Sequence, residues 1–107
     1  MIHNLSDISL NDSQKLALAK AIMAGAIDKP VHVSLGTEQL ATARDMLDEL
    51  DIIHYSNRHN TIKINDEYLP FLVQSGIIDD SNQLTQEMND LVSEPTVTES
   101  FYSFYFS

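Results

Sequence analysis

The sequence predicts an α+β fold that is mainly helical. A helix, a strand, a helix, a β-hairpin and a helix follow one another, with an extra C-terminal helix and tail. Three observations lead to this prediction. Apolar residues recur at spacings of three and four in residues 11–25 and 37–51, which is the period of an amphipathic helix. Apolar and polar residues alternate over residues 31–35, as in a half-buried strand. Residues 52–64 place a polar turn between two short apolar runs, which is typical of a hairpin.

The first helix is expected to begin near residue 11 and to run to about residue 24. Asn11, Asp12 and Ser13 each carry a side-chain oxygen that can accept a hydrogen bond from the free N–H groups of the first turn. Gly25 is a suitable stop because glycine adopts the left-handed conformation at little cost. The expected apolar face consists of Leu16, Ala19, Met23 and Ile27, with Leu18 and Ile22 beside them.

The second helix is expected over residues 37–51, after the strand at residues 31–35 and a turn at Gly36. Thr37 is the best candidate for its N-cap. Arg44 and Asp48 are one turn apart, so their side chains can form an ion pair that stabilises the helix by about 0.2–0.5 kcal/mol. The expected inner stripe consists of Leu40, Ala43, Leu47 and Leu50.

The hairpin is expected to turn at residues 56–60, which are polar and rich in turn-forming residues. On its returning strand, Ile62 and Ile64 should point inward and Lys63 outward, because side chains alternate along a strand. Two more helices are predicted downstream, at residues 66–75 and 82–92, the second starting near Ser81. We divide the chain into a domain of residues 1–78 and an acidic C-terminal helix with an aromatic tail over residues 79–107.

Charge is distributed unevenly along the 107 residues, whose formal net charge is −10. Residues 66–107 contain eight acidic residues and no basic residue, whereas residues 52–65 contain Arg58 and Lys63 and no acidic residue. The overall charge argues against a nonspecific nucleic-acid binder, because phosphate would be repelled at long range. The hairpin is the locally positive stretch.

Neither a membrane span nor a disulfide framework is expected. No run approaches the length of about 18 apolar residues that a spanning helix needs, and the N-terminus lacks the basic start and apolar core of a signal peptide. The chain contains no cysteine. We therefore expect a cytoplasmic protein with no membrane partner.

Residue patterns for catalysis, for a cofactor and for a metal are missing from the sequence. The three glycines stand alone, so no phosphate-cradling loop can be built from them. The four histidines, His3, His32, His54 and His59, do not match the spacing of a helical zinc site, and no cysteine could complete such a site. Residues 79–82 lack the glycine and the distal glutamate of a calcium loop. We expect a non-enzymatic protein with no cofactor and no metal.

The predicted order of elements over residues 10–75 resembles a winged-helix domain, in which residues 37–51 would be the recognition helix and the hairpin the wing. The segment LATARDMLDELDII resembles the junction before the wing in bacterial regulators of this family. Two features depart from the family pattern: residues 26–36 leave no room for the usual short helix, and the second helix is acidic. The resemblance implies a regulator that binds DNA or RNA, with dimerisation through C-terminal additions.

Two groups of residues would make the nucleic-acid contacts under this interpretation. The polar or basic residues of the second helix are Thr37, Gln39, Thr42 and Arg44. Those of the wing are Asn57, Arg58, His59 and Lys63. The hairpin alone is also compatible with a polar turn whose two cations have no ligand. In that case, only the similarity to the winged-helix fold would support a contact between the hairpin and phosphate.

A protein–protein interaction module, such as an accessory or virion-type component, is the alternative function. It would use the acidic C-terminal part and an aromatic terminus as the contact with a homodimer partner or another protein. The aromatic residues of this terminus are Phe101, Tyr102, Phe104, Tyr105 and Phe106.

Overall fold

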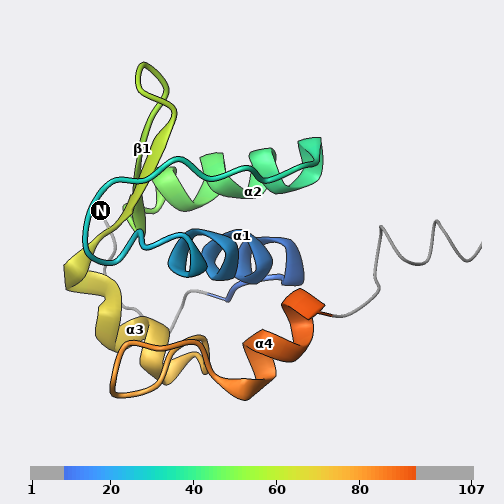
Figure 1. Ribbon diagram of the computed structural model, residues 1–107, viewed down its shortest axis with the longest axis vertical. Helices are drawn as coiled ribbons and strands as arrows, with labels where there is room; N and C mark the ends of the chain where they lie inside the picture. The colour runs from blue at the N-terminus through green and yellow to red at the C-terminus, as the bar shows by residue number, and fades with distance from the viewer. Residues whose placement is uncertain (1–8, 94–107) are drawn as a thin grey trace, which may run out of the picture.

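The computed structural model describes residues 9–93 and contains four α-helices and one two-stranded antiparallel hairpin. The helices are α1 (Asp12–Met23), α2 (Glu38–Glu49), α3 (Leu69–Gln74) and α4 (Gln86–Ser93). The strands are β1 (Ile53–Ser56) and β2 (Thr61–Ile64), and a 3-10 turn, η2 (Asp66–Tyr68), leads into α3. Helix α1 lies in the middle of the molecule and packs against α2 on one side and α4 on the other (Figure 1). The α+β class predicted from the sequence is confirmed.

Helix α1 begins and ends where the local sequence predicts. The side chain of Asn11 accepts a hydrogen bond from the Gln14 N–H, while the Gln14 side chain accepts one from the Asn11 N–H, both at 2.8 Å. This reciprocal arrangement satisfies two N–H groups that the first turn would otherwise leave without a partner. Gly25 follows the helix with φ of +99°, a conformation that a side chain would strain.

Helix α2 begins after Thr37, whose hydroxyl accepts a hydrogen bond from the Leu40 N–H at 3.1 Å. Its inner positions Leu40, Ala43 and Leu47 are buried, as their spacing predicts. The expected ion pair between Arg44 and Asp48 does not form, because both side chains are used elsewhere, as described below.

Two of the expected elements differ from the structure. Residues 31–35 keep the predicted alternation of burial, but only Val31 pairs with another strand, through reciprocal backbone bonds with Ile62 of 3.1 and 2.9 Å. The third expected helix, residues 66–75, is divided between η2 and the short α3, and Asn65 caps its start. These differences leave the order of the elements unchanged.

The fourth helix begins at Gln86, later than the sequence predicts from Ser81. The Asp79 carboxylate accepts hydrogen bonds from the N–H groups of Ser81 and Gln83, at 2.8 and 3.1 Å, and this holds the chain in a loop. Thr85 then accepts a bond from the Met88 N–H at 3.3 Å and donates one to the Gly76 carbonyl at 2.6 Å. A short polar side chain that binds nearby backbone favours turns over helix, which explains the delay.

A single apolar core joins all these elements. Buried side chains from α1, α2, the hairpin, α3 and α4 belong to one cluster, and Met88 brings α4 into it. The largest fully buried side chains are Leu18, Leu47, Ile52, Ile53, Ile64, Leu72, Ile77 and Ile78. Tyr68 lies at the edge of this core with its ring perpendicular to that of Phe71. Burial raises the pKa of the Tyr68 phenol, and the charges of Asp51 and Glu67 raise it further.

Met23 departs from the predicted apolar face of α1: it is 60% exposed, whereas Leu18 on the same helix is fully buried. We therefore expect Leu18→Ala to lower the free energy of unfolding by about 2–5 kcal/mol, because it removes buried contacts and leaves a cavity. Met23→Ala should change it by less than about 0.5 kcal/mol. Urea unfolding followed by circular dichroism measures both values, and equal losses for the two variants would contradict the assignment of the core.

Candidate nucleic-acid interface

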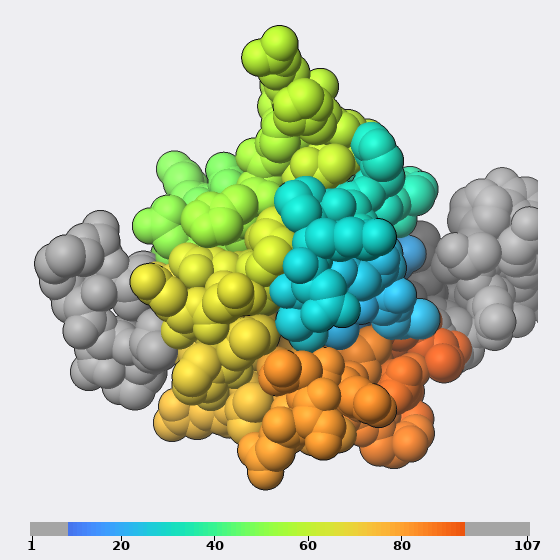
Figure 2. Space-filling model, turned by 60° about the vertical axis from the view of Figure 1, so that its left-hand side comes forward, coloured from blue at the N-terminus to red at the C-terminus, as the bar shows by residue number. Residues whose placement is uncertain are grey.

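The hairpin extends from the body of the molecule beyond α2, and its turn forms a narrow projection at one end (Figures 1 and 2). In β1 and β2, Ile53 lies opposite Ile64 and Tyr55 opposite Ile62, with His54 opposite Lys63. Strand β2 is paired on both sides, because Ile62 also bonds to Val31. The hairpin is therefore anchored at its base, and its turn is open to contact.

Alternation along the strands gives the hairpin two different faces. Ile53, Ile62 and Ile64 are buried against the helices, and we call their side of the hairpin the inner face. His54 and Lys63 point the other way, onto what we call the outer face, where His54 is exposed. The sequence predicts this division correctly for the returning strand.

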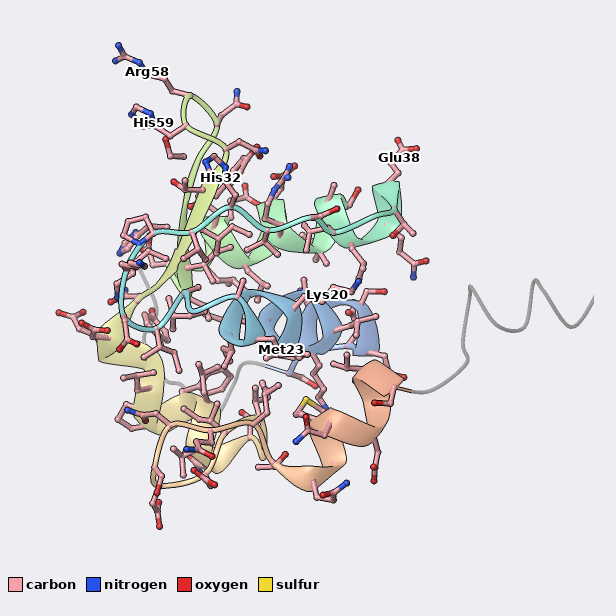
Figure 3. All side chains as sticks on the ribbon, viewed as in Figure 1. Lys20, Met23, His32, Glu38, Arg58 and His59 are labelled. Atoms are coloured by element: carbon pink, nitrogen blue, oxygen red, sulfur yellow. The ribbon has the colours of Figure 1, made fainter. Side chains whose placement is uncertain are left out.

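Arg58 and His59 lie in the turn of the hairpin and point away from the body of the molecule (Figure 3). Asn60 closes the turn with φ of +55°, a left-handed conformation that asparagine tolerates. The His59 N–H donates to the Ser56 hydroxyl at 3.2 Å. The turn is thus ordered by its own short-range bonds, while the side chains of Asn57, Arg58 and His59 are exposed.

The two cations of the hairpin have different surroundings. The Lys63 ammonium donates to the Asp66 carboxylate at 3.1 Å and to the Ile64 carbonyl at 2.8 Å, so its charge is partly neutralised. Arg58 forms no ion pair with any residue of the described range 9–93. Of the two hairpin cations, Arg58 is therefore the more available to an anion in solution.

Most of the expected contact residues of α2 are bound within the protein. The Thr37 hydroxyl caps the helix, and the Gln39 amide donates to the Ser13 hydroxyl at 2.7 Å. Arg44 is only 19% exposed and donates to the Asp45 carboxylate at 3.1 and 3.0 Å. Thr42 is exposed and makes no side-chain hydrogen bond within the described residues. Of these four residues, Arg44 contacts the hairpin, through the ring of Tyr55.

The exposed side of α2 is acidic. Glu38, Asp45 and Glu49 are all exposed along this helix, and of these three only Asp45 is paired with a cation in the part of the chain that the structure describes. Carboxylates repel phosphate, so this surface is a poor partner for a nucleic-acid backbone. The favourable electrostatic environment lies at the hairpin.

Arg44 and Asp48 instead connect α2 to the hairpin. The Arg44 guanidinium lies over the Tyr55 ring, with its central carbon 3.9 Å from the ring centroid. The Asp48 carboxylate accepts a hydrogen bond from the Tyr55 N–H at 2.9 Å. Both contacts fix β1 on α2, so these two residues position the hairpin.

His32 lies beside the hairpin turn, a position that the sequence did not predict. Its Nδ1 lies 3.0 Å from the Asn60 carbonyl oxygen, which can only accept, so Nδ1 donates. The alternation at residues 31–35 indicated that His32 faces solvent, but nothing local showed that this segment lies beside the hairpin turn. His54 was expected among the hairpin residues that could meet phosphate, and the structure places it opposite Lys63.

Three further expectations concern a metal site, a membrane span and the aromatic terminus. Among the described residues, no group of three or more histidine or acidic side chains could hold a metal ion. No helix over residues 9–93 has both the length and the apolar character to cross a membrane. The aromatic residues proposed for partner contact, Phe101, Tyr102, Phe104, Tyr105 and Phe106, lie outside the described residues, so that expectation stays a prediction.

Comparison with known proteins adds no relative. No protein-family model matches the chain, and no curated protein sequence and no solved structure resembles it significantly. Any functional inference must therefore come from the chain itself.

Asp48→Ala should lower the free energy of unfolding by about 1–3 kcal/mol, because it leaves the part-buried Tyr55 N–H without a partner. Asp48→Asn should lose less, since its amide oxygen can still accept the bond. Glu49→Ala, which removes a neighbouring exposed carboxylate, serves as the control and should change stability little. Chemical denaturation measures all three variants. A loss for Glu49→Ala as large as that for Asp48→Ala would contradict this role.

A double-mutant cycle tests the contact between Arg44 and Tyr55. We expect Arg44→Ala and Tyr55→Leu to interact by about 0.5–1 kcal/mol, the usual contribution of a guanidinium stacked on an aromatic ring at a partly exposed site. The free energies of unfolding of the two single variants, the double variant and the unchanged protein provide the value. Additive effects would show that the stacking contributes nothing to stability.

Proposed function

We propose that the chain is a non-enzymatic, winged-helix-like protein that binds nucleic acid, and that the tip of the hairpin contacts phosphate. The order α1, the Val31 segment, α2 and the hairpin supports the winged-helix interpretation. The pairing of Val31 with Ile62 supports it further, because it brings the segment expected as the first strand beside the hairpin.

The position of Arg58 carries this proposal. Its guanidinium is exposed at the end of a projecting turn, lies within a stretch that contains no acidic residue, and has no ion-pair partner in residues 9–93. A guanidinium presents several N–H donors in a fixed plane and suits phosphate oxygens. Exposed cations on a thin projection can approach a backbone that the acidic body would repel.

The arrangement favours weak and salt-sensitive binding by one copy of the chain. Few hairpin cations are available, and the acidic groups of α2 oppose phosphate. A homodimer would present two hairpins to one nucleic acid and raise the affinity without new kinds of contact. We propose such a dimer as the binding form.

The Arg58→Ala variant tests the proposed contact. We expect it to weaken binding to a labelled duplex by roughly five- to tenfold and to lower the salt slope of the affinity by about 1, because one phosphate contact is lost. Lys20→Ala is the control, since it removes the same charge from the body of the molecule, away from the hairpin tip (Figure 3). Fluorescence anisotropy at two salt concentrations measures both quantities.

Equal losses for Arg58→Ala and Lys20→Ala would reduce the effect to net charge and would contradict contact at the tip. If the unchanged protein binds neither duplex nor single strand at low salt, the nucleic-acid function is wrong. The prediction of a protein–protein module would then remain, and association that requires residues 94–107 would support it.

A further inference from the structure

The outer face of the hairpin carries further groups that can bind phosphate, in addition to those at its tip. His54 and Lys63 lie opposite each other on this face. Because Val31 is paired with Ile62 on the inner side, the next residue, His32, falls on the outer side next to Thr61. The exposure of His32 between the half-buried Val31 and Val33 agrees with this placement.

We propose that a duplex lies along this outer face, where His32, His54 and Lys63 contact its phosphates behind the leading Arg58, and that α2 does not touch it. This inference rests on the proposed nucleic-acid function and specifies its surface and its ligand. It also assigns α2 a structural role, whereas the winged-helix resemblance implies that α2 is the recognition helix.

The two faces of the hairpin explain why the duplex takes the outer side. The Tyr55 ring on the inner face lies beneath Arg44, so α2 occupies the inner side. The outer face points the opposite way, and a duplex bound there is separated from the exposed carboxylates of α2 by the hairpin itself. The strand segments that form this face contain no acidic residue, and Asp66, which binds Lys63, approaches it from η2.

The chemistry of His32 suits this role. Its Nδ1 is held by the Asn60 carbonyl, which fixes the ring beside the turn that carries Arg58 (Figure 3). Nε2 makes no hydrogen bond to the described residues, so it is available to a ligand. An imidazole that carries a proton on both ring nitrogens donates from each of them, and phosphate oxygens accept such bonds. His54 offers a second imidazole on the same face, next to Lys63.

Matched charge changes on the outer face and on the exposed side of α2 show which of these two surfaces contacts the duplex. His54→Glu and His54→Lys alter the outer face, and Thr42→Glu and Thr42→Lys alter the exposed side of α2. Anisotropy with a labelled duplex should be measured at about 0.15 M salt, where charge effects fade over about 8 Å. We expect His54→Glu to weaken binding roughly fivefold or more, His54→Lys to tighten it about two- to threefold, and both Thr42 variants to change it by less than about twofold.

His32→Gln is the second outer-face variant and should weaken binding about two- to threefold. Thermal unfolding by circular dichroism identifies any variant that fails to fold. If His54→Glu fails to fold, the duplex affinities of His54→Lys and His32→Gln test the proposed outer-face contact in its place.

Sign-dependent responses at Thr42 without responses at His54 would overturn this inference in favour of α2 and leave the nucleic-acid function intact. Equal responses at both positions would overturn it as well, because they would indicate a general charge effect. Absence of duplex binding by the unchanged protein would instead remove the proposed function on which this inference depends, and identical affinity in Arg58→Ala would remove the proposed contact at the tip.

Discussion

The burial of three isoleucines on one face of the hairpin is the constraint on which the candidate site depends. Ile53, Ile62 and Ile64 join the same core as the helices, and β2 is bonded on both sides. A strand whose alternate side chains are buried cannot shift by one residue without moving all of them to the other face. The same burial therefore decides which side chains face solvent, so the exposed position of His54 follows from the packing of its neighbours.

Elements whose signals are local were predictable from the sequence. Asn11 and Thr37 cap their helices because a short polar side chain satisfies the first turn directly, and the isoleucines of the hairpin reveal its period. The predicted start of α4 is too early because Asp79, Ser81 and Asn82 all resemble helix caps. In the structure Thr85 precedes the helix, and its hydroxyl is held by a bond to the Gly76 carbonyl, nine residues away. The predicted strand at residues 31–35 is too long, since only Val31 pairs with another strand. Alternation indicates which side chains are buried, but it does not indicate a pairing partner.

The candidate site was less predictable because it depends on contacts between segments that are far apart in sequence. Arg44 has the spacing of a partner for Asp48, but Tyr55 and Asp45 take its guanidinium. His32 reaches Asn60 because the neighbouring Val31 pairs with Ile62 of β2. Spacing along one helix can propose an ion pair, but it cannot show that an aromatic ring from another element competes for the same cation.

The contact between Asp48 and Tyr55 has a consequence for how the protein behaves at high concentration. Tyr55 lies opposite Ile62, whose backbone bonds to Val31, so the Tyr55 N–H points to the free edge of the hairpin. A carboxylate already occupies that donor, and a strand arriving from another molecule would have to displace it. The Asp48 side chain therefore opposes the addition of a foreign strand at this edge of the hairpin.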